Sequence, residues 1–156
     1  MRLTIAAIGR LKSGPELELI TDYSKRIAAS GRPLALGPLE IHEIDERKTR
    51  ERDSQSAKLL ERVSSGTFTV AVDERGKAMT SPEFAKLIER VRDQGADEMA
   101  FLIGGADGHT KDLRARSDQL LSFGQMVWPH MLARVMLTEQ LYRAVSILAG
   151  SPYHRV

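Results

Sequence analysis

The sequence predicts an α/β protein of three layers, in which helices cover both faces of a mainly parallel sheet. Short apolar segments alternate along the chain with amphipathic segments of about ten residues or more, as strands alternate with crossover helices. One apolar segment, from Met99 to Ile103, is hydrophobic without interruption and stops at two consecutive glycines. A central parallel strand, which is buried on both faces, has this composition.

The N-terminal half is predicted to contain three strands separated by two helices. The strands are short apolar runs: Leu3 to Ile8, Leu39 to Ile44 and Phe68 to Val72. The first helix begins at Pro15 and places three apolar residues on one stripe: Leu17, Ile20 and Ile27. The second helix, within residues 49–63, has a stripe of four: Ala57, Leu59, Leu60 and Val63.

The C-terminal half continues the alternation. Thr80, followed by Ser81, Pro82 and Glu83, is typical of a helix start, and the buried stripe of this helix would be Phe84, Leu87, Ile88 and Val91. After the strand at residues 99–103 we expect a helix from Lys111 to Leu121, capped by Thr110, and then a brief strand from Gln125 to Trp128. Pro129 ends that strand, and a long apolar helix follows until Gly150 and Pro152 stop it.

A chain of 156 residues with 42% hydrophobic content matches one domain, spanning residues 1–156, and it shows no repeat or low-complexity linker. It has no cysteine, which excludes disulfides, thiolate catalysis and cysteine-based metal sites. The apolar start is shorter than the core of a signal peptide, and no run approaches the roughly 20 apolar residues of a membrane span. We therefore expect a cytoplasmic protein that makes no contact with a membrane.

The net charge of +2 is too small to indicate a nucleic-acid partner by itself. The distribution says more, since residues 109–156 carry 6 basic and 3 acidic side chains, whereas residues 1–108 carry 17 and 18. The C-terminal third, which also holds three of the four histidines, is therefore expected to be the electropositive end.

Ligands of an open parallel sheet bind beyond the carboxyl ends of the strands, which directs attention to the loops after Val72, Ile103 and Trp128. Three glycines within residues 104–108 would let backbone amides approach a ligand closely. Their spacing matches neither a dinucleotide fingerprint nor a phosphate-binding P-loop. A tight turn between a strand and a helix explains the same glycines without any ligand.

Two other segments have an unusual composition. Residues 122–130 crowd a glycine, the only tryptophan and a proline into one short connection, for which an ordinary loop at the edge of the core is the alternative. The tail brings Tyr153, His154 and Arg155 together after the last helix, where most domains fray, so a solvated tail without function is the alternative there.

The remaining polar residues have simpler interpretations. Glu139 and Arg143 lie four positions apart on a helix, the spacing of a surface ion pair, which we favour over a catalytic role. His42 on a strand and His109 in a loop have no neighbours that suggest a metal site. We expect the protein to bind no metal.

Several stretches form a distinctive set when they are taken in order: Val72-Asp73-Glu74-Arg75-Gly76-Lys77, Phe101-Leu102-Ile103-Gly104-Gly105, Leu121-Ser122-Phe123, Pro129-His130, Arg134-Val135, Glu139-Gln140-Leu141-Tyr142-Arg143-Ala144 and Pro152-Tyr153-His154-Arg155. From the first strand to the last residues the chain resembles the RlmH family of SPOUT methyltransferases. The resemblance is most specific in the C-terminal half, where Pro-His, Leu-Tyr-Arg-Ala and Tyr-His-Arg recur at matching spacing, and it is generic in the N-terminal half.

The resemblance implies a SPOUT fold, in which the C-terminal segment is tucked through a loop to form a trefoil knot that holds S-adenosylmethionine. Knots are nearly absent from proteins, so periodicity alone does not predict one. The positions that the family uses for this cofactor correspond here to Val72, Gly104, Gly105, Phe123, Gly124, Gln125, Met126, Val127 and Trp128.

The resemblance also implies an activity, which is methylation of N3 of a pseudouridine in the helix 69 stem-loop of 23S ribosomal RNA, on the assembled ribosome. Such a transfer needs positioning and removal of one proton, with neither a metal nor a covalent intermediate. His154 is the candidate for assisting deprotonation, with Tyr153 and Arg155 ordering the base and its phosphate.

RlmH-type enzymes act as homodimers in which the tail of one chain completes the site of the other. We expect the final helix to form that interface, because its apolar stripe (Val135, Leu141, Val145 and Leu148) exceeds what one face of a small sheet needs. A non-catalytic nucleotide- or RNA-binding module is the main alternative. A small-molecule hydrolase is disfavoured because the chain has no Gly-x-Ser-x-Gly elbow and no acid pair.

Overall fold

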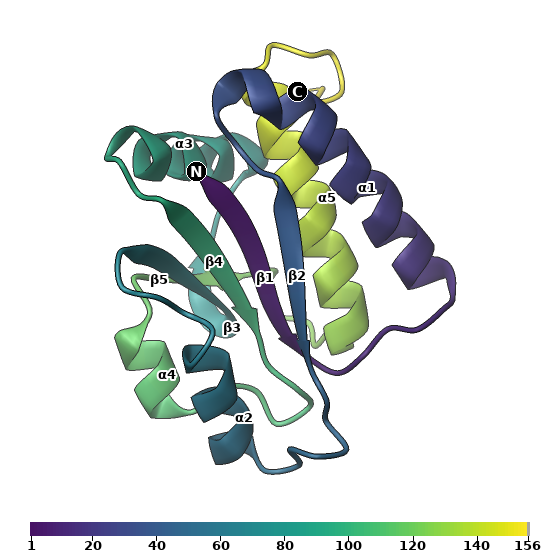
Figure 1. Cartoon of the computed structure of the whole chain (residues 1–156), viewed down its shortest axis with the longest axis vertical. Coiled ribbons are helices and arrows are strands. Elements are labelled where there is room, and N and C mark those ends of the chain that lie inside the picture. Colours follow the sequence, from purple (N-terminus) through teal and green to yellow (C-terminus); the bar gives the residue numbers. More distant parts are fainter. Residues whose placement is uncertain (156) are drawn as a thin grey trace.

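The computed structural model describes residues 1–155, and Val156, the last residue of the predicted tail, lies outside the described residues. The strands are β1 (Arg2–Ile8), β2 (Leu39–Ile44), β3 (Thr67–Ala78), β4 (Glu98–Ile103) and β5 (Gln119–Ser122). They form a parallel sheet in the order β2-β1-β4-β3-β5 (Figure 1). The predicted α/β class with a parallel sheet is confirmed.

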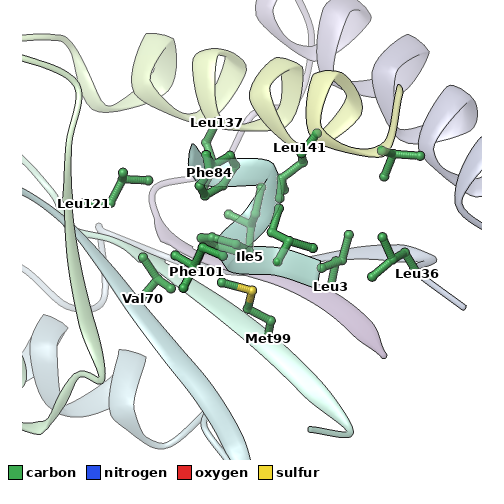
Figure 2. Packing of buried hydrophobic residues seen from close by; sticks show 14 of the residues in the cluster. Leu3, Ile5, Leu36, Val70, Phe84, Met99, Phe101, Leu121, Leu137 and Leu141 are labelled. Carbon is green, nitrogen blue, oxygen red and sulfur yellow. The ribbon is translucent and has the colours of Figure 1, made fainter. Parts of the chain in front are cut away.

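Helices cover both faces of the sheet. On one face pack α1 (Pro15–Gly31), α3 (Ser81–Asp93) and α5 (His130–Leu148), with the short 3-10 helix η1 (Arg32–Leu34) after α1; on the other pack α2 (Arg52–Leu60) and α4 (Lys111–Arg116). Figure 2 shows the larger core, where Phe84, Leu137 and Leu141 of the helices meet Ile5 and Phe101 of the strands. Each such side chain contributes about 1.5–3 kcal/mol when fully buried, so this face supplies most of the hydrophobic stabilisation.

Two expectations about local structure are confirmed. β4 lies between β1 and β3, and all of its residues are buried, as a central strand requires. The start of α3 is a capping box, in which the Thr80 hydroxyl accepts from the Glu83 amide at 3.3 Å and the Glu83 carboxylate accepts from the Thr80 amide at 2.7 Å.

The predicted helix over residues 111–121 is wrong beyond Arg116, because its last residues belong to β5. Asp118 begins the pairing of this strand with β3. Its carboxylate accepts from the Thr69 amide at 2.7 Å, and its own amide donates to the Thr69 carbonyl at 2.9 Å. Residues 125–128 were expected to form a strand, but they belong to the loop between β5 and α5. Tertiary pairing outweighs the helical propensity of the two leucines in β5.

β3 is longer than predicted, and it is interrupted beside β5. Val72 and Lys77 both pair with Leu121, so residues 73–76 are looped out of the ladder. Gly76 permits this arrangement, since a Cβ at that position would lie 2.6 Å from backbone atoms of β5. Bulges of this kind re-aim side chains near functional sites. Here the bulge directs residues 73–75 toward the carboxyl edge of the sheet.

The final helix is present, but its apolar stripe does not lie where the sequence analysis expected it. Leu141 and Val145 are fully buried against the sheet, whereas Val135 and Leu148 are partly exposed. The core therefore uses much of the apolar surface that was assigned to a subunit interface. Across residues 1–155, no helix has both the length and the hydropathy needed to cross a membrane.

Candidate functional site

Three loops meet beyond the carboxyl ends of the strands and enclose a cavity of about 320 Å³. They are the looped-out part of β3 at residues 73–76, residues 104–109 after β4 and residues 123–129 after β5. In Figure 1 this is the lower end of the sheet, where the arrow of β1 ends. The volume lies at the lower end of the range for small-molecule sites, which is roughly 300–1,000 Å³.

Most of the residues that the resemblance assigns to the cofactor line this cavity: Val72, Gly104, Gly105, Phe123, Gly124, Met126, Val127 and Trp128. Gln125 belongs to the same loop but is not part of the lining. Sheet order explains the convergence, because β4, β3 and β5 are adjacent and the loops that leave their ends lie side by side. The structure therefore brings the three predicted segments together.

The glycine loop after β4 is a tight turn as well as a wall of the cavity. The Gly108 amide donates to the Gly105 carbonyl at 3.0 Å, and Gly108 has a positive φ of 71°. A Cβ on Gly104 would come within 3.1 Å of the Gly108 backbone. A Cβ on Gly105 would instead meet the Gln55 side chain at 2.8 Å. The turn interpretation and the ligand interpretation thus apply to the same loop.

The loop before α5 presents apolar side chains to solvent at the mouth of the cavity. Met126, Val127 and Trp128 are 74%, 87% and 41% exposed, which is unusual for large apolar residues that lie together. The Ser122 hydroxyl fixes the entry to this loop, because it accepts from the Gly124 amide and donates to the Gly124 carbonyl, both at 3.1 Å. These side chains form an apolar rim that a ligand or a second protein can cover.

A buried carboxylate that sequence reasoning did not single out lies in the wall of the cavity. The side chain of Asp73 is 4% exposed and has guanidinium nitrogens of Arg75 and Arg114 at 3.5 and 3.7 Å. Asp73 also accepts from the Arg75 amide at 2.9 Å. The sequence offered one signal for this residue, because Asp73 directly follows Val72 in a loop that was already predicted to bind a ligand. The bulge in β3, which aims this side chain inward, was not readable from the sequence.

His109 closes the glycine loop from below and is 2% exposed. Its Nε2 lies 3.1 Å from the Leu102 carbonyl, and its Nδ1 has no partner among the described residues. Burial lowers the pKa of this imidazole, and the nearby Leu102 carbonyl and Asp73 only partly oppose that shift. The neutral imidazole therefore supports the glycine loop by packing. Within residues 1–155, no three His, Asp or Glu side chains gather as a metal-ligand group.

Arg134 anchors the beginning of α5 next to the cavity. It is 1% exposed, and its guanidinium donates to the carbonyls of Ile8 and Gly9 at 3.3 and 2.9 Å and to Glu43 at 2.6 Å. Glu43 in turn accepts from the Leu11 amide at 2.7 Å. One buried side chain thus ties the helix that follows the cavity loop to the ends of β1 and β2.

The tail residues named by the resemblance do not reach this cavity in the same chain. Tyr153 donates to Glu139 at 2.9 Å and packs on Tyr142 with ring centroids 4.6 Å apart, while His154 Nδ1 lies 3.3 Å from the Arg143 guanidinium. These contacts lie on the middle and the C-terminal half of α5. Glu139 is nine residues beyond His130, which starts α5 and lines the cavity, so about 14 Å of helix axis lies between these two residues.

The tail contacts also refine two interpretations of the sequence. The predicted ion pair between Glu139 and Arg143 is present, with a closest N to O distance of 2.5 Å. The alternative of a solvated tail does not describe Tyr153, whose ring and hydroxyl are both engaged. Arg155 is exposed.

An open apolar groove of about 550 Å³ runs along α5 on the outer side of the α1, α3 and α5 layer. Its lining combines buried and exposed residues of several elements: Leu19, Tyr23, Ala78, Met79, Ser81, Phe84, Leu121, Ser122, Phe123, Gly124, Val135, Met136, Glu139 and Gln140. Phe123 and Gly124 belong to the cavity as well, whereas Glu139 belongs to the tail contacts. The groove therefore connects the two regions that the resemblance marks as functional.

Comparison with known proteins gives a consistent family. A family model described as "Predicted SPOUT methyltransferase" matches residues 1–154. Proteins named "Ribosomal RNA large subunit methyltransferase H" from Dinoroseobacter shibae and Ruegeria pomeroyi are 53% and 51% identical to the chain, with all of both chains aligned. The protein of that name from Roseobacter denitrificans is 52% identical over 99% of each chain. With its parallel sheet and its cavity between the β3, β4 and β5 loops, this chain belongs to the RlmH family of SPOUT methyltransferases. The trefoil knot that the resemblance implies stays a prediction.

Proposed function

We propose that this protein transfers a methyl group from S-adenosylmethionine to N3 of a pseudouridine in the helix 69 stem-loop of 23S ribosomal RNA, on the assembled ribosome. The observation that carries the proposal is the cavity at the carboxyl edge, which is lined by the loops where the family holds its methyl donor. The names of the most similar relatives support ribosomal RNA as the substrate.

The lining fits S-adenosylmethionine in both shape and chemistry. Glycine backbone at positions 104 and 105 leaves room for a ligand to approach main-chain amides, and Phe123, Met126 and Trp128 offer apolar walls. Asp73 supplies a carboxylate in a wall that also contains two guanidiniums, so both charges of an amino-acid moiety have a possible counterpart. Bound S-adenosylmethionine would supply an electrophilic methyl group on a sulfonium.

The chain itself must then hold the base in line with that methyl group and remove the N3 proton. We assign proton removal to His154, with Tyr153 ordering the base and Arg155 binding a phosphate. General-base assistance of this kind contributes about 10² to 10⁴-fold to a rate. Since the tail contacts Glu139, Tyr142 and Arg143 of α5 rather than the cavity loops of its own chain, these residues are assigned to the cavity of a second copy.

The groove along α5 provides the surface for that second copy. In a two-fold symmetric dimer each residue meets its partner's residue in a reciprocal way, so opposite ends of a long interface face each other. One end of the groove contains Phe123 and Gly124 of the cavity, and the other contains Glu139 and Tyr23 beside the tail. Symmetric pairing of two grooves in opposite directions would bring the tail of one chain to the cavity of the other. Of the stripe first expected at the interface (Val135, Leu141, Val145 and Leu148), this surface keeps Val135, whereas Leu141 and Val145 are buried in the core.

The direct test is methyl transfer from isotopically labelled S-adenosylmethionine to ribosomes purified from a strain that lacks this gene. We expect label in 23S ribosomal RNA, and mass spectrometry of the RNA fragments should place it on one pseudouridine of helix 69. Label on another nucleotide would overturn the assigned substrate. Cofactor binding without any transfer would support the non-catalytic RNA-binding alternative instead.

A further inference from the structure

We propose that a basic surface next to the cavity binds the phosphate backbone of the RNA substrate. This inference rests on the proposed function and names the part of the protein that holds the RNA. The surface, called the basic edge, consists of exposed side chains from the β1–α1 loop, the β2–α2 loop, α2 and the turn after α2: Arg10, Lys12, Arg47, Lys48, Arg50, Arg52, Lys58 and Arg62.

Charge is concentrated in these segments although the chain is nearly neutral. Residues 10–12 and 45–62 contain eight of the 23 basic side chains but only five of the 21 acidic ones, which leaves 15 basic and 16 acidic for the rest. The surplus expected in the C-terminal third does not form such a surface, because Arg134 is buried and Arg143 is paired with Glu139. The positive potential therefore gathers at the carboxyl edge beside α2.

Most cations of the basic edge have no acidic partner to neutralise them. Within residues 1–155, carboxylates lie within 4.0 Å of only two of the eight, as Arg10 reaches Asp45 at 3.9 Å and Arg52 reaches Asp53 at 4.0 Å. Lys and Arg side chains that project freely into solvent neutralise phosphates at little desolvation cost, and each contact releases a counterion from the nucleic acid.

The basic edge also has a concave part in which four of its cations lie together. A cavity of about 380 Å³ is lined by four of its cations (Arg10, Lys48, Lys58 and Arg62) and by Glu43, Asp45 and Glu61. Two of these carboxylates are already engaged, since Glu43 binds Arg134 and Asp45 binds the Arg47 amide at 3.0 Å. A bound anion would balance the positive charge that remains in this cavity.

The basic edge is continuous with the cofactor cavity and separate from the groove. Arg52 belongs to the basic edge and also lines the cavity. Gln55, which is buried, donates to the Thr49 carbonyl at 2.9 Å and lies against Gly105, so the β2–α2 loop is braced on the glycine loop. The groove lies on the opposite face of the sheet, so dimerisation there leaves the basic edge open.

The composition of the basic edge favours RNA over a membrane or a protein partner. The exposed large apolar side chains among the described residues are Leu19, Met126, Val127, Trp128 and Leu132, and none belongs to this surface. Protein interfaces and membrane-bound helices bury apolar side chains at their centre, whereas phosphate contacts need cations alone.

The test compares two triple variants of equal charge in the full-length protein. Lys48→Gln/Lys58→Gln/Arg62→Gln alters the basic edge, and Arg32→Gln/Lys86→Gln/Arg90→Gln alters exposed cations elsewhere.

Binding to ribosomes and to a single-stranded ribosomal RNA fragment is measured between about 50 and 200 mM salt, the range in which counterion release is visible. We expect the first variant to lose about tenfold in affinity and to lower the slope of log K against log salt by roughly 2, as two to three phosphate contacts are lost. The control should match the wild type, and calorimetry should give equal S-adenosylmethionine affinity for all three proteins.

Equal salt slopes for the two variants would overturn the inference. Loss of ribosome binding with an unchanged slope and unchanged binding to the free RNA fragment would identify a ribosomal protein as the partner and would overturn it as well. The proposed function is judged separately, because wild-type protein that binds RNA through this surface without transferring methyl would contradict only that function.

Discussion

The cavity loops and the C-terminal tail differ in almost every structural respect, although both carry residues that mark the family. The cavity loops follow three adjacent parallel strands and are held by the sheet, by Gly76 and by buried Arg134. The tail lies at the other end of α5 and is held by a few contacts of Tyr153 and His154. One region is thus positioned by the core and the other by a helix end. Under the proposed function, the two regions are halves of a site that only two chains complete together.

The largest expected effect is on methyl transfer, when a variant altered in the cavity loop is mixed with a variant altered in the tail. Gly124→Val alters the cavity loop, where φ is +107° and a Cβ would meet no atom within 4 Å, so the strain stays local. His154→Ala alters the tail. We expect each protein alone to lose about 10²-fold or more of its methyl transfer rate. Re-associated one to one, they should recover about a quarter of wild-type activity, because half of the pairs are mixed and each mixed pair holds one intact site.

The control for this experiment mixes each variant with itself, and circular dichroism checks that both proteins fold. Recovery in the mixture with no recovery in either control identifies a site shared between chains. If the mixture stays as inactive as its components while both variants remain dimeric, the tail does not act on the partner's cavity.

Placing two carboxylates in the groove should dissociate the proposed dimer. Val135→Glu/Met136→Glu puts two carboxylates into a surface that the proposed dimer buries, and both positions are only partly buried in the single chain. Dimer interfaces of obligate type bury roughly 2,000 Å² or more, so buried carboxylates should shift the protein to a monomer. Light scattering should report half the wild-type mass, together with a loss of methyl transfer.

The matched control, Gln94→Glu/Ala115→Glu, adds the same two carboxylates at exposed positions outside the groove, the cavity and the basic edge. It should remain a dimer with normal activity. A fully active monomer of the groove variant would contradict both the interface and the shared site.

The cavity end should show a pH dependence of stability that comes from buried His109. Burial lowers the pKa of His109, so the unfolded chain binds more protons than the folded one as pH falls below the ordinary histidine value of about 6.5. The stabilisation is therefore complete above that pH and declines as pH falls toward the lowered pKa, with a slope of at most about 1.4 kcal/mol per pH unit. Urea unfolding of wild type and His109→Gln at about pH 7.5 and 5.5 should show a smaller decline in the variant. Equal declines would contradict this prediction, because they would mean that folding does not change the pKa of His109.

The tail should make a small but measurable contribution to stability. Tyr153→Phe keeps the ring on Tyr142 and removes only the hydrogen bond to Glu139. We expect a loss of about 0.5–1.5 kcal/mol in the free energy of unfolding, and a larger loss for Tyr153→Ala, which also removes the ring contact. Thermal unfolding measures both. If neither variant changes the midpoint, the tail is the solvated end that the sequence also allowed.

Local pattern predicted most of the secondary structure because burial and capping act over a few residues. The run from Met99 to Ile103 has no polar side chain, so only a doubly covered strand could contain it, and Thr80 with Glu83 satisfies the first amides of α3 within one turn. β5 escaped prediction because its pairing with β3 depends on Thr69, which is 49 residues away from Asp118. For the same reason the bulge at residues 73–76 and the buried Asp73 were not foreseen.

By itself the sequence determined the α/β class, the position of the ligand loops after the strands and, through its motifs, the residues that the family uses at those loops. Tertiary structure alone decided which apolar face of α5 is core and which is groove, where the unpaired cations gather and how far the tail lies from the cavity. The physical reason is the distance along the chain over which each effect acts. Periodicity and capping are properties of neighbours in the chain, whereas burial, charge clustering and the separation of two half-sites depend on segments that only folding brings together.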